Sequence, residues 1–224
     1  MHNYYSKKLS AEQLRLCYKI APPRVKRYLE AEIKFVLDRI KPSDLVLELG
    51  CGYGRVLKKM VPKAKTVVGI DTSYDSLRLT QKTINSTSSC HIIEMNAIEL
   101  GFSDQQFDVV FCIQNGISAF KVDQRKLIEE SMRVTYPGGT VLFSSYSERF
   151  WEDRLEWFRL QSKHALIGEI DEDATGDGTI VCKDGFRAST VSPDDFVSLI
   201  QGLDIDPIIT EVDYSSIFYE IRIK

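Results

Sequence analysis

The stretch from Leu45 to Leu57 constrains the fold of this chain more than any other part of the sequence. It begins with a short apolar run, Leu45–Leu49, of the kind that forms a buried parallel strand. Glycines follow at positions 50, 52 and 54, and apolar residues then recur at helical spacing. A strand, a glycine turn and a helix in this order let a ligand touch bare backbone at the start of the helix. The stretch therefore predicts an α/β fold with a ligand site at this turn.

The residues around the glycines favour a nucleoside ligand without phosphates. A dinucleotide fingerprint would place its third glycine where this chain has Arg55, and no Gly-Lys-Ser/Thr triplet of a P-loop follows. Glu48 stands just before the turn, where a carboxylate would repel a pyrophosphate and suit a positively charged ligand group. Asp71 ends the next apolar strand, and an acid at that position can accept hydrogen bonds from a ribose diol.

Several segments resemble the motifs of class I S-adenosylmethionine (SAM)-dependent methyltransferases, in that family's order and spacing. Residues 48–54 resemble the first motif, and residues 68–71 resemble the second strand with its ribose-binding acid. Residues 107–113 resemble the fourth strand, and residues 133–139 the turn into the fifth. The resemblance implies a doubly wound, Rossmann-like α/β sheet of seven strands, six parallel and the last antiparallel. It also implies SAM as the cofactor and S-adenosylhomocysteine (SAH) as the product.

The resemblance assigns the cofactor contacts residue by residue. Glu48 would lie near the methionine amino group, Asp71 at the ribose, and Gln114 by the methionyl group. The family often carries an acid at the adenine, whereas this chain has Asn96, whose amide can still accept and donate hydrogen bonds there. The full predicted cofactor-binding set is Glu48, Gly50, Cys51, Gly52, Gly54, Asp71, Thr72, Asn96, Ala97 and Gln114.

The remaining chain predicts additions to a single methyltransferase domain. Residues 1–42 form an N-terminal helical cap, in which Ser10 begins a capped short helix and Pro23 opens a second helix with an apolar stripe. Residues 43–146 form the SAM-binding core, with a turn at 137–139 before its fifth strand. Residues 147–191 are interpreted as a substrate lid, and residues 192–224 as the last helix and a closing β-hairpin.

Candidate acceptor-binding residues come from the cap, the strand tips and the lid. The side chains proposed to contact the acceptor are Tyr5, Tyr18, Asn115, Tyr146 and Trp151, although ordinary packing would also explain each aromatic residue. His164 lies in the lid region and is the best candidate for a general base, although a lone histidine is more often structural. The tip of the fourth strand lacks the Asn/Asp-Pro-Pro-Tyr/Phe motif of adenine and glutamine amide methyltransferases. It also lacks the Pro-Cys of cytosine C5 enzymes.

Neither the histidines nor the acidic run at residues 169–178 predicts a metal site. The chain has three histidines and no H-x-x-x-H pattern. The acidic run superficially suggests a calcium loop from Asp171, but its twelfth position would be Cys182 instead of glutamate. A solvated loop, or the rim of a site for an amine or another cationic substrate, explains the run better.

The composition of the chain limits the classes of partner that it is expected to bind. A net charge of −3 gives no electrostatic case for nucleic acid or an anionic membrane. The sequence lacks an apolar run of the ~18 residues that a membrane span needs. The five cysteines are scattered and predict reduced thiols in a cytoplasmic protein. We therefore expect a monomer or homodimer that acts on a small molecule.

The sequence thus predicts methyl transfer from SAM to an oxygen, nitrogen or carbon atom of a small-molecule acceptor. Such a reaction needs mainly positioning, which can supply about 7–11 kcal/mol of the barrier. Two alternatives stay open. The first is a SAM-binding protein without catalysis that acts as a partner or regulatory subunit. The second is a nicotinamide-dependent reductase, which the glycine spacing disfavours.

Overall fold

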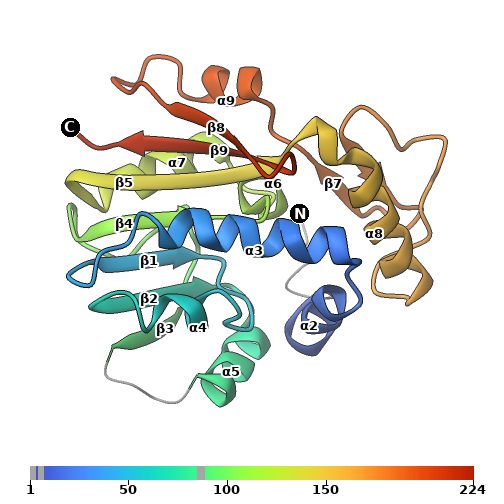
Figure 1. The fold of residues 1–224 in the computed structure, drawn as a ribbon, viewed down its shortest axis with the longest axis horizontal. Coiled ribbons are helices and arrows are strands. Elements are labelled where there is room, and N and C mark those ends of the chain that lie inside the picture. Colours follow the sequence, from blue (N-terminus) through green and yellow to red (C-terminus); the bar gives the residue numbers. More distant parts are fainter. Residues whose placement is uncertain (1–3, 5–7, 85–88) are drawn as a thin grey trace.

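A seven-stranded sheet forms the centre of the molecule (Figure 1) in the computed structural model, which describes residues 4, 8–84 and 89–224. Its strand order is β3-β2-β1-β4-β5-β9-β8. The strands are β1 (Leu45–Leu49), β2 (Thr66–Asp71), β3 (Cys90–Glu94), β4 (Phe107–Cys112), β5 (Thr135–Tyr146), β8 (Ile208–Val212) and β9 (Ser216–Arg222). Strands β1 to β5 pair in parallel, and β9 runs antiparallel to both β5 and β8. The predicted sheet of six parallel strands and an antiparallel last strand is therefore confirmed.

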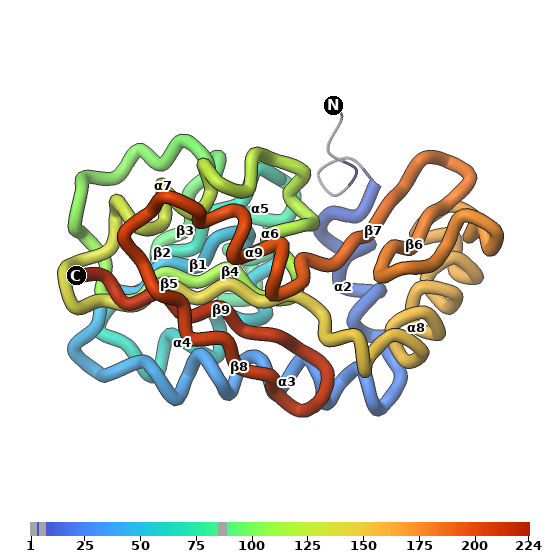
Figure 2. Tube along the Cα trace, turned by 90° about the horizontal axis from the view of Figure 1, so that it is seen from above, coloured from blue at the N-terminus to red at the C-terminus, as the bar shows by residue number. Residues whose placement is uncertain are grey.

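The side chains of successive strand residues pack into two separate hydrophobic cores, one on each face of the sheet. Val46, Val109 and Leu142 pack with α3 (Pro23–Leu37), α4 (Leu57–Met60) and α5 (Tyr74–Thr83). Their neighbours Leu47 and Val110 pack on the other face with α6 (Gly116–Ala119), α7 (Gln124–Arg133) and α9 (Pro193–Leu199). Figure 2 shows α3 and α7 on opposite sides of the sheet. Because both faces are covered, the central strands are apolar at almost every position.

A third core joins the N-terminal segment to residues 147–191, beyond the carboxyl ends of the parallel strands. It contains side chains from α2 (Ala11–Lys19), the first half of α3, and α8 (Trp151–Lys163), which follows the 3-10 turn η1 (Glu148–Phe150). The hairpin of β6 (Thr179–Val181) and β7 (Arg187–Ser189) completes it. The indole N–H of Trp157 donates to the carbonyl of Cys17 at 3.0 Å. The predicted cap and lid segments therefore share one hydrophobic core.

Two local predictions are wrong. Ser10 begins α2 but makes no side-chain cap. Instead, the N–H of Ala11, which has a φ of 48°, bonds the hydroxyl of Ser76 on α5 at 2.9 Å. Strand β5 begins at Thr135, and not after the glycines, because Thr135 pairs with Phe107 of β4 ahead of an irregularity in the ladder, and the N–H of Gly138 donates to the carbonyl of Ile223 at 2.7 Å.

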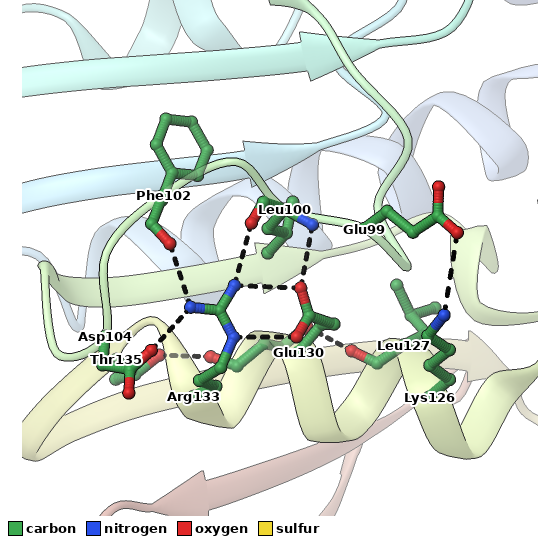
Figure 3. A network of polar contacts seen from close by, with 10 residues as sticks. Glu99, Leu100, Phe102, Asp104, Lys126, Leu127, Glu130, Arg133 and Thr135 are labelled. Atoms are coloured by element: carbon green, nitrogen blue, oxygen red, sulfur yellow. Dashed lines mark hydrogen bonds and ion pairs between the residues drawn. The ribbon is translucent and has the colours of Figure 1, made fainter.

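Helix α7 fixes the connection between β3 and β4 through one arginine. The guanidinium of Arg133 donates to the carbonyls of Leu100 and Phe102 at 2.9 Å each and to Asp104 at 2.7 Å (Figure 3). Glu130 binds the same guanidinium and also accepts the N–H of Leu100 at 2.8 Å. This network holds the loop that directly follows the predicted adenine-contacting residues.

Candidate functional site

A cavity of about 180 Å³ lies at the carboxyl ends of β1, β2 and β4. Most of the predicted cofactor-binding residues line it: Glu48, Gly50, Gly52, Asp71, Thr72, Asn96, Ala97 and Gln114. A second wall, which meets the glycine turn at α2, comes from α2, α3, the end of β5, and α8, through residues that include Tyr18, Tyr28, Tyr146, Trp157, Phe158 and Gln161. The cavity thus runs from the glycine turn to an aromatic wall built by the third core.

The glycine turn combines left-handed backbone with close packing. Gly50, Gly52 and Gly54 have φ values of 74°, 54° and 80°. The N–H groups of Gly50 and Cys51 donate to the carbonyl of Ile70 at 2.9 and 2.8 Å, which fixes the turn to β2. Cys51 and Gly54 lie behind the cavity wall: the Cys51 side chain packs on Gly69, and Gly54 faces Thr80 of α5.

We expect Gly54→Ala to destabilise the protein more than Gly138→Ala does. The two glycines have similar φ values, 80° at Gly54 and 82° at Gly138. A Cβ on Gly54 would lie 2.6 Å from Thr80 Cγ2, whereas a Cβ on Gly138 meets no described atom within 4 Å. Strain at this φ costs about 1–2 kcal/mol at either site, and the clash should add about 1–2 kcal/mol at Gly54. Urea unfolding of both variants measures the difference, and equal losses would refute the packing role of Gly54.

Asp71 shapes the turn and also faces the cavity. Its two carboxylate oxygens accept the N–H groups of Gly52 and Ser73, each at 2.8 Å. Burial raises the pKa of Asp71, while these backbone donors act in the opposite direction. A carboxylate can accept more than one bond at each oxygen. Asp71 can therefore hold the glycine turn and still bind a diol.

Glu48 is a buried acid with unused hydrogen-bonding capacity. It is 4% exposed, and its Oε2 has no hydrogen-bond partner in the described part of the chain. Burial raises the pKa of Glu48 to about 8, and the nearby Arg55 guanidinium partly offsets that effect. A buried carboxyl is neutral unless a cation or donor compensates its charge. The position is therefore suited to a ligand group that brings a positive charge.

The tip of β4 is held in a rare backbone conformation by a residue that the sequence analysis missed. Gln114 and Asn115 have φ values of 58° and 61°. Glu32 of α3, which is fully buried, accepts the N–H of Gln114 at 2.7 Å and also accepts the hydroxyl of Ser216. The hydroxyl oxygen of Ser144 is a second acceptor for the Gln114 N–H, at 2.9 Å. The sequence signal was available, because Glu32 falls among the apolar positions that α3 buries.

The Gln114 side chain points into the cavity with one half of its amide engaged. Tyr18 donates its hydroxyl to Gln114 Oε1 at 3.0 Å. Gln114 Nε2 is buried and has no partner among the described residues. A buried donor without a partner carries a desolvation cost that a bound acceptor atom would remove. Gln114 therefore presents an N–H group to a ligand.

The predicted acceptor-binding residues divide between the cavity and other locations. Tyr18 and Tyr146 line the cavity, whereas Tyr5 lies outside the described residues. Asn115 and Trp151 are not in the cavity wall formed by the described residues. The Asn115 amide instead donates to the carbonyl of Ser189 and accepts the hydroxyl of Ser145, both at 2.9 Å, so it ties β4 to β7 and β5.

His164 and the acidic run also lie away from the described cavity wall. His164 is exposed at the C-terminal end of α8. In the acidic run, Glu169 pairs with Lys183 and Glu172 pairs with Arg159, on exposed surface. In residues 4, 8–84 and 89–224, no group of three or more His, Cys, Asp or Glu side chains could hold a metal ion.

The aromatic wall contains cavity residues that sequence reasoning did not select. Tyr28 of α3 and Trp157, Phe158 and Gln161 of α8 all line the cavity. The helical spacing of α8 identified a buried face, but not which part of that face would meet the cap and which would meet a ligand. None of the helices described here combines the length and apolar character that crossing a membrane requires.

The sequence and the fold of this chain are similar to those of known methyltransferases. Residues 46–139 match a family described as a methyltransferase domain. The chain is 30% identical over 151 residues to 2-methyl-6-phytyl-1,4-hydroquinone methyltransferase of Synechocystis sp., an alignment that covers 58% of this chain and 46% of that protein. It is also 30% identical over 155 residues to malonyl-[acyl-carrier protein] O-methyltransferase of Marinomonas sp., covering 63% and 55%. The chain thus spans about half the length of the curated relatives it matches.

The fold is shared along the full chain. The crystal structure of the PH0226 protein from Pyrococcus horikoshii OT3 aligns over 100% of both chains with a TM-score of 0.71 and 22% identity. That likeness extends the shared fold to the cap, the inserted segment and the closing hairpin. The match over residues 46–139 and the similarity to the two curated methyltransferases support a place for this chain in the class I SAM-dependent methyltransferase family, and PH0226 shows the shared fold.

Proposed function

We propose that this protein transfers the methyl group of SAM to an oxygen, nitrogen or carbon atom of a small-molecule acceptor. The observation that carries the proposal is one continuous cavity with Glu48 and Asp71 at one end and an aromatic wall at the other. Two matched relatives are named as methyltransferases of a hydroquinone and of a malonyl group on a carrier protein. An enclosed cavity of this kind suits a small acceptor better than a large folded one.

In the proposed arrangement, Asp71 accepts the ribose hydroxyls and Glu48 faces the methionine ammonium. Asn96 and Ala97 would contact the adenine, and Gln114 would lie beside the reacting methyl. In the reaction, the carbon–sulfur bond of SAM breaks as a bond to the acceptor atom forms, SAH leaves, and a neutral acceptor releases a proton. The chain's own contribution is to position the two reactants and exclude water. The exposed location of His164 gives no support to a general-base role for it.

Calorimetry with SAM and with SAH tests the proposal first. Micromolar binding of both would support it, and an acceptor screen followed by mass spectrometry would then seek a mass gain of one methyl group. Binding without turnover on any acceptor would favour a non-catalytic SAM-binding protein. Absence of binding at millimolar SAM would refute the proposal.

We also propose that residues 147–191 act as the substrate lid over the core, and that the protein works as a cytoplasmic monomer or homodimer.

We expect SAM binding to release a proton at pH 7, and Glu48→Gln to abolish that release. Burial holds the pKa of Glu48 at about 8, so the free carboxyl is mainly neutral at pH 7. An ammonium group beside it would lower this pKa and drive the proton off, so affinity should rise as pH increases toward 8. Calorimetry in two buffers of different ionisation enthalpy measures the proton count. Glu94→Gln, an exposed site at the end of β3, is the control. Equal proton release in the Glu48→Gln protein would contradict the assignment.

A further inference from the structure

Aromatic rings from four elements, α2, α3, the end of β5 and α8, form one wall of the cavity. Tyr18 of α2 lies with its ring centroid 6.1 Å from that of Trp157, and Tyr28 of α3 lies 5.6 Å from Tyr146. Phe158 adjoins Trp157 on α8 and also lines the cavity. The two ring pairs are tilted by 42° and 41°, and the flat face of each ring gives a planar ring more contact than it gives a flexible chain. The wall therefore favours a planar acceptor.

Guanidinium groups lie against two of these rings. Arg55 is 4.7 Å from the centroid of the Tyr18 ring, and Arg154 is 4.2 Å from that of Tyr146. Arg154 is 1% exposed and donates to the carbonyls of Gly178 and Ala188, so its position is fixed. Neither arginine is among the described residues that line the cavity. The two tyrosines are thus already engaged in cation–π contacts. Arg55 also lies 3.9 Å from Glu30 and close to Glu48, so the repulsion of a further positive charge at the acceptor end comes mainly from the buried Arg154.

The acidic residues near the cavity do not make its acceptor end attractive to a positively charged acceptor. Glu48 and Asp71 lie at the glycine turn, the end proposed for the cofactor. Glu32 is closer to the aromatic wall, but it lies outside the described cavity lining, and its two oxygens accept the N–H of Gln114 and the hydroxyl of Ser216. Besides Glu48 Oε2, two polar atoms of the described lining are buried and have no partner among the described residues: the Tyr28 hydroxyl, which can donate or accept, and Gln114 Nε2, which is a donor. A donor binds an oxygen lone pair and has nothing to offer an ammonium.

Three features bear on the acceptor: the aromatic wall, the guanidinium groups of Arg55 and Arg154 beside it, and the unpartnered donor Gln114 Nε2. From them we propose that the acceptor is a planar ring that carries an oxygen atom, that is neutral or anionic, and that is not an ammonium compound. The ring lies against the aromatic wall, and the oxygen accepts a hydrogen bond from Gln114 Nε2. This inference rests on the proposed function, because it names the acceptor class of the same site.

Trp157 provides the signal for the test. The chain has two tryptophans, and Trp151 is not in the described cavity wall, so Trp151→Phe leaves Trp157 as the only tryptophan, whose emission is then followed. In this background, 2-naphthol and 2-naphthylmethylamine are titrated at pH 7, with and without saturating SAH. The two probes share a ring system and differ in carrying a hydroxyl or an ammonium group. We expect saturable quenching by both, with naphthol at least about tenfold tighter.

A second substitution tests the hydrogen bond. Gln114→Leu in the same background should weaken 2-naphthol binding by about tenfold and leave 2-naphthylmethylamine unchanged. Gln81→Leu, an exposed position on α5, should change neither. Equal or tighter binding of the amine would overturn the inference, as would naphthol binding that is indifferent to Gln114. Calorimetric binding of SAH is scored separately, so its loss would refute the proposed function, while the probe comparison on cofactor-free protein still decides the acceptor class.

Discussion

Replacing Asp71 with alanine should weaken SAM binding by roughly 2–4 kcal/mol, because two charge-assisted hydrogen bonds to the ribose would be lost. The structure adds a second contribution in the same direction. Asp71 also accepts the N–H of Gly52 at 2.8 Å, so the substitution frees a glycine that lines the cavity. Calorimetric titration of wild type and variant with SAM measures the loss, which corresponds to at least about thirtyfold in Kd.

The two contributions of Asp71 can be separated. Asp71→Asn keeps an oxygen that can accept the Gly52 N–H but removes the negative charge, so it should lose less affinity than Asp71→Ala. Asp75→Ala, an exposed site in the first turn of α5, is the control and should bind SAM normally. A change of only a few tenths of a kcal/mol in the free energy of SAM binding in Asp71→Ala would contradict the assignment of Asp71 to the ribose.

The sheet was predictable because its signals are local. Each parallel strand is a short apolar run, and the glycine turn and Asp71 mark the ends of β1 and β2 where ligands bind in doubly wound sheets. The start of β5 was not predictable, because it depends on the pairing of Thr135 with Phe107 of β4 and on the hydrogen bond from Gly138 to Ile223 near the far end of the chain. A local turn signal at 137–139 cannot reveal a distant partner.

The acceptor end of the cavity could be predicted only in part for the same reason. Tyr18 was selected as an aromatic residue of the N-terminal cap and Tyr146 as one at the end of the fifth strand, and both line the cavity. Asn115 was selected for its place after β4, but its amide is engaged by Ser189 and Ser145 from segments that no spacing rule links to it. Trp151 and Trp157 are indistinguishable by type. Only the packing of α8 against α2 decides which of them faces the cavity.

Glu32 should make the protein less stable at pH 8 than at pH 5, and Glu32→Gln should remove that dependence. Burial raises the pKa of Glu32 from 4.5 to about 7, and its hydrogen bonds to Ser216, Ser144 and Gln114 only partly offset burial. The folded state then holds a proton that the unfolded state has lost, so stability falls as pH rises from 4.5 toward 7. At about 1.4 kcal/mol per pKa unit, the loss amounts to about 3 kcal/mol.

The variant isolates this contribution from other groups that titrate in the same range, Glu48 among them. Glutamine keeps a side-chain oxygen for the Gln114 N–H and cannot ionise. The difference in unfolding free energy, variant minus wild type, should therefore rise by about 2–3 kcal/mol between pH 5 and pH 8. Urea unfolding at several pH values measures this difference, and Glu30→Gln, exposed on the same helix, should give a difference that does not change with pH.

A difference for Glu32→Gln that does not change with pH would mean that the buried carboxylate is ionised throughout. The Gln114 N–H and the Ser216 hydroxyl would then stabilise its charge fully, and the tip of β4 would be held by an anion at every pH at which the protein is folded.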